Sequence, residues 1–69
     1  MPHIAVSMYP GRDAGTKEAL AKKIHDLVAE ELQVPSHVVS VSVEDVPKEN
    51  WAESMKKYSD DVMFVKPGV

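Results

Sequence analysis

The chain has 69 residues, enough for one domain that is only marginally stable alone. It contains no cysteine, which excludes disulfides and thiolate metal sites, and its histidines do not follow the spacing of a metal motif. The net charge of −3 argues against a nucleic-acid surface, and no apolar run is long enough to cross a membrane. No signal peptide is visible, so we expect a cytoplasmic protein that gains stability by forming a homo-oligomer.

The first patterned segment is residues 3–9, in which apolar and more polar side chains alternate. The apolar members are Ile4, Val6 and Met8. A period of two predicts a strand with one buried face. The next two residues, Pro10 and Gly11, are typical of a turn.

Residues 14–33 have the pattern of an amphipathic helix. Its apolar positions recur at helical spacing and are Leu20, Ile24, Leu27, Val28 and Leu32. Asp13 or Thr16 can cap the start of this helix, and Pro35 lies just beyond its end.

A second strand is predicted over residues 38–46, where valines and polar residues alternate. Val39, Val41 and Val43 share one face, and Ser40, Ser42 and Glu44 share the other. A strand, a helix and a strand form a βαβ unit, so the fold class is α/β (α+β) with parallel strands. The helix covers one face of this small sheet, and we expect another subunit to cover the other.

The pattern is weaker after Pro47. Residues Lys48–Tyr58 are predicted to form a short helix with Trp51, Met55 and Tyr58 on one side, and Met8, Met55 and Met63 are predicted to fill apolar space. Residues 62–65 are predicted to be a short strand or hairpin arm that pairs across a subunit boundary. His25 and His37 are predicted to lie on the surface.

Pro2 is the most informative residue, because it directly follows Met1. If Met1 is removed, the ring nitrogen of Pro2 becomes a free secondary amine. An apolar environment disfavours the charged form of an amine, so such a nitrogen could act as an uncharged base at neutral pH.

The Met-Pro start, the strand, Pro10-Gly11-Arg12, the amphipathic helix, Val34-Pro35 and Trp51 together resemble the 4-oxalocrotonate tautomerase family of the tautomerase superfamily. The start Met-Pro-His-Ile and the Lys-Pro-Gly ending are more similar to the branch that contains a dimeric phenylpyruvate tautomerase. This resemblance implies a cofactor-independent keto–enol isomerase that acts on small enol or keto acids. It also implies a homo-oligomer, either a dimer or a hexamer.

The resemblance implies roles for individual residues. Pro2 matches the general base, Arg12 matches the arginine that binds the substrate carboxylate, and Trp51 matches the aromatic wall of the pocket. Ser40 stands where the hexameric type has a second arginine, so a dicarboxylate such as 2-hydroxymuconate should be a poor substrate and a monoacid is favoured. His3 is a candidate substrate contact, since strand alternation places it on the side of Ser7 and Tyr9.

Two alternatives remain open at this point. Glu53 falls where related hydratases and dehalogenases place a carboxylate that activates water, although those enzymes also use an arginine where this chain has Tyr9. The other alternative is an oligomeric binding module that has kept the fold and lost activity, because Ser40 replaces the second arginine.

Overall fold

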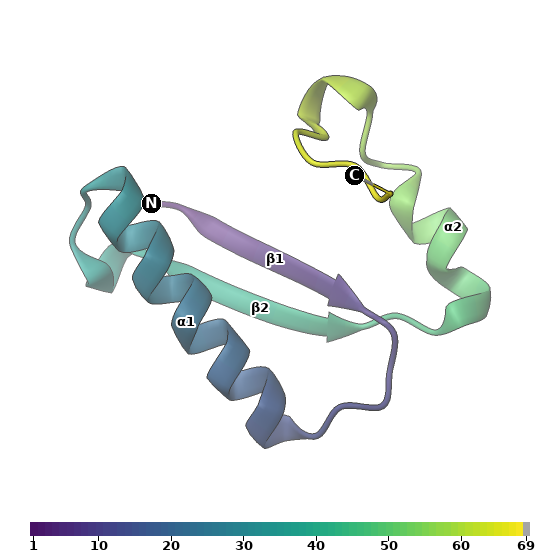
Figure 1. Cartoon of the computed structure of the whole chain (residues 1–69), viewed down its shortest axis with the longest axis horizontal. Coiled ribbons are helices and arrows are strands. Elements are labelled where there is room, and N and C mark those ends of the chain that lie inside the picture. Colours follow the sequence, from purple (N-terminus) through teal and green to yellow (C-terminus); the bar gives the residue numbers. More distant parts are fainter. Residues whose placement is uncertain (69) are drawn as a thin grey trace.

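The computed structural model describes residues 1–68. The strands are β1 (His3–Met8) and β2 (Ser40–Asp45), and the α-helices are α1 (Ala14–Leu32) and α2 (Trp51–Met55). Short 3-10 helices connect them: η1 (Ser36–Val38), η2 (Lys48–Asn50) and η3 (Asp60–Val62). Figure 1 shows the long helix crossing the pair of strands, with the C-terminal segment gathered at the far end of β1.

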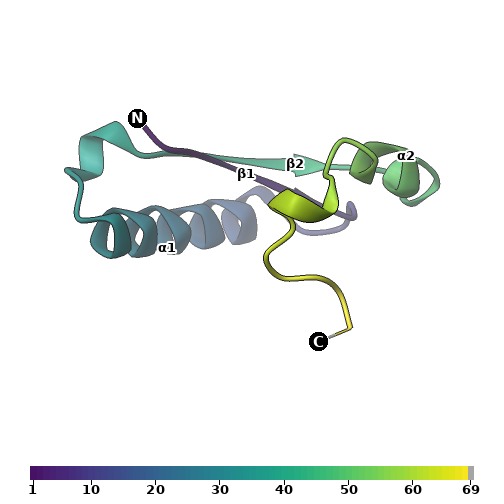
Figure 2. The same ribbon diagram turned by 90° about the horizontal axis from the view of Figure 1, so that it is seen from above.

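β1 and β2 run parallel, as the βαβ pattern predicts. Their register pairs His3 with Ser40 at one end and Met8 with Asp45 at the other. The ladder extends beyond both ends, since Ser40 N donates to Pro2 O at 3.1 Å and Val46 N donates to Met8 O at 2.8 Å. Figure 2 shows α1 on one face of this sheet, so the opposite face is left open by the helix.

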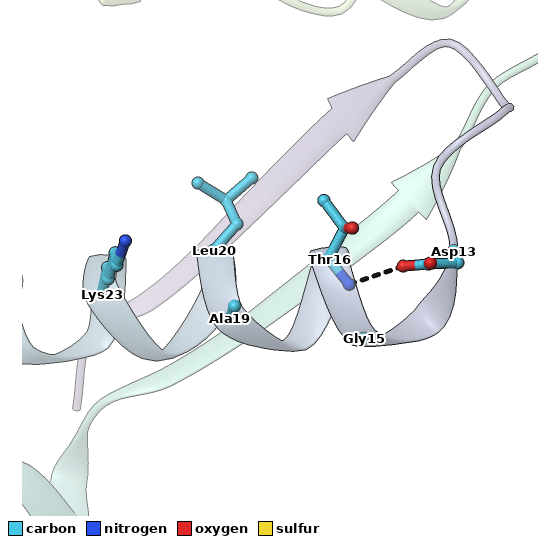
Figure 3. Close-up of a pocket in the computed structure, with 6 residues that line it drawn as sticks. All are labelled: Asp13, Gly15, Thr16, Ala19, Leu20 and Lys23. Carbon is cyan, nitrogen blue, oxygen red and sulfur yellow. Dashed lines mark hydrogen bonds between the residues drawn. The ribbon is translucent and has the colours of Figure 1, made fainter.

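Asp13 is the residue that caps α1. Its carboxylate accepts a 2.7 Å hydrogen bond from the backbone N–H of Thr16, as Figure 3 shows. This bond holds the pKa of the Asp13 carboxyl below its usual value, because it favours the charged form. One turn further on, Lys17 forms an ion pair of 3.0 Å with Asp45, which ties the start of α1 to the end of β2.

α1 ends at Leu32 because Gln33 adopts a left-handed conformation with φ 55°. Gln33 N donates to Glu30 O, and Val34 N donates to Ala29 O at 3.1 Å, which satisfies carbonyls at the helix end. The predicted helix, residues 14–33, was therefore one residue too long.

The apolar stripe of α1 is only partly covered. Ile24 and Val28 are half-buried, whereas Leu27 and Leu32 are 57% and 58% exposed. A sheet of two strands is too narrow to cover the whole stripe. Within residues 1–68 the buried hydrophobic residues are Val39 and Val46, which flank β2.

Several predicted boundaries were wrong. The first strand ends at Met8 instead of residue 9, and the second covers 40–45 because η1 occupies residues 36–38. The helix predicted over 48–58 is divided into η2 and the short α2. Within the single chain, residues 62–65 form no strand, since η3 ends at Val62 and no third strand of the described chain offers a partner for their backbone. The pairing predicted for them across a subunit boundary stays a prediction.

His25 is partly exposed, with 29% of its side-chain surface accessible, and its ring contacts two neighbouring groups. The side chain is half-buried, and its Nδ1 lies 3.0 Å from an Asp26 carboxylate oxygen. Its Nε2 lies 2.8 Å from the Ser36 carbonyl, which links α1 to η1. Both partners accept hydrogen bonds, so the Asp26 carboxylate, followed by Ser36, raises the pKa of His25. His37 is exposed, as predicted.

Candidate active site

Pro2 lies at the beginning of β1. It is half-buried, and its carbonyl accepts the backbone hydrogen bond from Ser40. Met1 is 98% exposed and makes the Pro2 nitrogen an amide in this chain. The base predicted from the sequence is thus fixed to the sheet on its carbonyl side, while the residue that blocks its nitrogen projects into solvent.

Arg12 and Trp51 lie at the other end of β1. Arg12 is exposed and donates from Nη1 to the Tyr9 carbonyl at 3.5 Å. The half-buried Trp51 packs edge to face on the Tyr9 ring, with centroids 5.0 Å apart and planes at 84°. Because the six residues of β1 extend about 20 Å, one protomer brings Arg12 and Trp51 together near Tyr9 but holds Pro2 away from them.

The loop between β1 and α1 depends on Gly11. Its φ of 129° lies in a region that side-chain-bearing residues rarely adopt, and no atom outside the neighbouring residues comes within 4 Å of a Cβ built there. The glycine is therefore required by the backbone turn that precedes Arg12, and its surroundings are open.

An apolar pocket of about 300 Å³ lies beside Trp51. Its floor comes from Ala5 and Ser7 on the open face of β1, and its walls come from the C-terminal segment. The lining residues are Ala5, Ser7, Trp51, Met55, Tyr58, Val62 and Met63. Met55 and Met63 are half-buried and line this pocket, where they had been predicted only to fill space. The 51, 55 and 58 spacing was the sequence signal for this wall.

His3 and two serines form a hydrogen-bonded cluster on the open face of the sheet. His3 Nδ1 lies 2.7 Å from Ser40 Oγ, and His3 Nε2 lies 3.1 Å from Ser42 Oγ. The sequence analysis named His3 and Ser40 but gave no role to Ser42. The alternation of the strand could have found it, because Ser42 follows Ser40 on the same face.

Glu53 lies on α2 and is exposed. Its carboxylate forms a 2.8 Å ion pair with Lys56, one turn further along the helix. The chain therefore places Glu53 in the same short helix as Trp51, with its charge partnered by a lysine.

Two further features of the described residues concern ligands. A surface depression along the first turns of α1 is lined by Asp13, Gly15, Thr16, Ala19, Leu20 and Lys23 (Figure 3). The Asp13 carboxylate in this depression already caps the helix through its hydrogen bond with Thr16 N. Residues 1–68 contain no group of three or more His, Asp or Glu side chains that could hold a metal ion. None of the helices described is long and apolar enough to span a membrane.

Comparisons with known proteins agree on one family. A family model described as "Tautomerase enzyme" matches residues 2–56, so the match starts at Pro2 and extends through Trp51. A probable tautomerase from Xylella fastidiosa is 37% identical over 62 residues, which cover 90% of this chain and 73% of that protein. A probable tautomerase from Bacillus cereus is 35% identical over 60 residues, 87% of this chain and 98% of that protein.

A third relative carries a more specific name. The 2-hydroxymuconate tautomerase of Comamonas testosteroni is 39% identical over 51 residues, which cover 74% of this chain and 81% of that enzyme. The parallel βαβ unit, the position of Pro2 before β1 and these matches confirm the resemblance seen in the sequence. The chain therefore belongs to the tautomerase family, whose members are isomerases.

Proposed function

We propose that this tautomerase interconverts the keto and enol forms of small 2-oxo acids, with the nitrogen of Pro2 as general base once Met1 is removed. The family match that begins at Pro2 is the observation that carries this proposal. The exposure of Met1 supports it, because an enzyme that removes the residue can reach it.

The reaction needs one proton to move within the substrate. The uncharged Pro2 nitrogen takes the proton of the enol hydroxyl, and the O–H bond breaks as the carbonyl forms. The electron pair of the C=C bond then takes a proton from the Pro2 ammonium, which forms a C–H bond and restores the free amine. General acid–base catalysis of this kind contributes roughly 10²–10⁴-fold to a rate.

We propose further that each site combines residues of two protomers. In one chain the six residues of β1, about 20 Å of extended backbone, lie between Pro2 and the loop that carries Arg12, which is too far for these two residues to contact one small acid. In the composite site Arg12 binds the substrate carboxylate through its planar guanidinium, and Trp51 excludes water from the reacting atoms. A homo-oligomer, dimer or hexamer, is then required for activity.

The substrate preference proposed is for a monoacid. Ser40 can donate one hydrogen bond to a substrate and carries no charge, so it offers a second carboxylate little compensation for lost hydration. An aryl-substituted enol acid such as phenylenolpyruvate fits this preference, since the apolar pocket beside Trp51 has room for a ring.

Mixed oligomers test the composite site. Pro2→Ala and Arg12→Ala chains are unfolded together and refolded, and each is refolded alone as a control. If Pro2 and Arg12 come from different protomers, random mixing restores about a quarter of the sites. A working site needs an Arg12→Ala chain to supply Pro2 and a Pro2→Ala chain to supply Arg12, and each of these has a probability of about one half. Recovery of no activity from correctly folded mixtures would show that both residues serve within one chain.

The base itself is tested with protein whose mass confirms that Met1 is absent. Pro2→Ala should lower kcat/KM for phenylenolpyruvate roughly 10²–10⁴-fold. Protein that retains Met1 should be inactive, because an amide nitrogen is not basic. An unchanged kcat/KM in Pro2→Ala would refute the assignment, whatever the oligomeric state.

Hydration or dehalogenation through Glu53 receives less support than tautomerisation. The Glu53 carboxylate is exposed and paired with Lys56. Bulk water therefore surrounds it, whereas the activation of a single water molecule needs a closed site. Glu53→Gln should change tautomerase activity less than about tenfold, or roughly 1.4 kcal/mol. A fast, Glu53-dependent reaction with a 3-haloacrylate would reverse this order.

A further inference from the structure

Both ring nitrogens of His3 contact a serine hydroxyl of β2, and these contacts restrict which hydroxyl is free. A neutral imidazole has one N–H donor and one acceptor nitrogen. One serine must therefore donate its O–H to the ring, while the other accepts the ring N–H. The hydroxyl proton of the second serine has no partner within the cluster and is available to a ligand.

Ser40 Oγ lies 2.7 Å from Nδ1 and Ser42 Oγ lies 3.1 Å from Nε2, so both contacts are within hydrogen-bond distance. The neutral ring allows two arrangements. Either Ser40 donates its O–H to Nδ1 and Ser42 accepts from Nε2–H, which leaves the Ser42 hydroxyl proton free, or the roles are reversed and the Ser40 hydroxyl proton is free.

Of the two serines, Ser42 is the one whose strand partner belongs to the apolar pocket. It is paired in register with Ala5, which forms part of the pocket floor, so both side chains project from the same open face. With Ser40 as the donor to His3 and His3 as the donor to Ser42, the two hydrogen bonds point the same way along the chain, and each bond in such a chain polarises the next. When Ser40 donates to the ring, the free O–H of Ser42 ends this chain next to Ala5, on the floor of a pocket able to take an apolar group.

We propose that Ser42, not Ser40, is the residue of β2 that donates a hydrogen bond to a substrate oxygen, and that His3 and Ser40 position it. This inference rests on the proposed function. The oxygen belongs to the carboxylate or to the enol group, and both present the same chemistry to an O–H donor. The consequence is a neutral donor site on β2 whose specificity depends on Ser42.

Kinetics of matched variants test the proposal. Hydrogen bonds to charged groups are worth roughly 1.5–3 kcal/mol, so Ser42→Ala should lower kcat/KM about 10- to 150-fold. Ser42→Thr keeps the hydroxyl and should restore most of this loss, while Ser40→Ala should cost less, because the His3 Nε2–H still holds Ser42. Ser36→Ala, in η1 and outside the cluster, is the control.

The division of the effect between kcat and KM identifies the oxygen. A substrate carboxylate is charged in both the ground state and the transition state, so removal of its hydrogen-bond donor should raise KM. Negative charge on the enol oxygen grows toward the transition state, so removal of a donor to that oxygen should lower kcat. A purely structural cluster would instead show Ser40→Ala at least as harmful as Ser42→Ala, in parallel with thermal stability. That pattern, or a Ser42→Ala activity within twofold of wild type, would overturn the proposal.

The tautomer of His3 provides a test that does not use activity. Long-range ¹H–¹⁵N spectra of the folded, full-length chain should show a proton on Nε2 and none on Nδ1, and His3→Gln supplies the assignment. A proton on Nδ1 would overturn the proposal even in an active enzyme. If Pro2→Ala loses activity and Ser42→Ala does not, the inference fails and the proposed function stands.

Discussion

The βαβ body, residues 3–46, and the C-terminal segment, residues 47–68, differ in how their apolar side chains are covered. In the body, Val39 and Val46 are 7% and 6% exposed. In the segment, Phe64 and Val65 are 92% and 78% exposed, although they are as apolar as the valines of β2. Regular structure follows the same division, since the segment contains only one short α-helix and two 3-10 turns.

This difference shows where the chain lacks partners. The body pairs its strands with each other and covers one sheet face with α1, so its backbone and much of its apolar surface find partners locally. The segment has no strand to pair with, and large exposed apolar side chains commonly mark an interaction site. Predictions for assembly should therefore concern the segment, and predictions for folding of the single chain should concern the body.

The largest expected effect is on assembly. Phe64→Ser should weaken self-association about 30-fold or more, because truncating an aromatic anchor at an interface typically costs at least about 2 kcal/mol. Sedimentation equilibrium measures the association constant. The matched control is Leu27→Ser, an exposed apolar residue of the body. If both substitutions weaken self-association equally, or if neither weakens it, the two regions do not differ in their contribution to assembly.

The next effect is on folding of the body. Val39→Ala should lower the free energy of unfolding by about 2 kcal/mol, since it removes two buried methyl groups and leaves a cavity. Val65→Ala removes the same atoms from an exposed position and should change it by less than about 0.5 kcal/mol. Denaturant unfolding at concentrations that favour the monomer separates the two. A larger loss from Val65→Ala would show that the segment is part of the folding core.

The sequence predicted the body well because its signals are local. Alternating valines and a helical stripe specify elements whose partners are nearby in the chain, and both strands and α1 formed within a few residues of the expected bounds. The strand expected at 62–65 depends on another subunit, because an apolar run becomes a strand only beside another strand and the single chain offers none there. The contact of His25 with Ser36 had no sequence signal, since it depends on the path of the chain after α1.

The candidate site was predicted in part for the same reason. The pairing of Trp51 with Tyr9 joins residues far apart in sequence, and nothing in either segment indicates it. His3 and Ser40 came from strand alternation and the family resemblance. Ser42 needed the register, because only the pairing of His3 with Ser40 places the next serine within reach of the second ring nitrogen.

A smaller effect is expected at the end of α1. Gln33 has φ 55°, and a left-handed conformation costs a residue with a Cβ roughly 1–2 kcal/mol. Gln33→Gly should therefore stabilise the body, by about 1 kcal/mol after the greater flexibility of glycine in the unfolded chain is counted. Thermal unfolding measures this gain, and Gln33→Ala serves as the comparison. A destabilised Gln33→Gly would mean that the side chain of Gln33 makes a contact worth more than the backbone strain.

The smallest expected effect is a pH dependence within the body, at the contact between α1 and η1. Asp26 and Ser36 raise the pKa of His25 above its ordinary value of 6.5, so the folded state binds this proton more tightly than the unfolded state does. The stabilisation is complete below pH 6.5 and is lost as the pH rises through the higher pKa of the folded state. Wild type should thus lose stability relative to His25→Gln between about pH 5 and 8, whereas His37→Gln, at an exposed histidine, should follow wild type. The carboxylate of Asp26 and the carbonyl of Ser36 both accept hydrogen bonds, so only the protonated ring of His25 can donate to both. If the free energy of unfolding of wild type and of His25→Gln changes with pH in parallel, this contact does not contribute to the stability of the body.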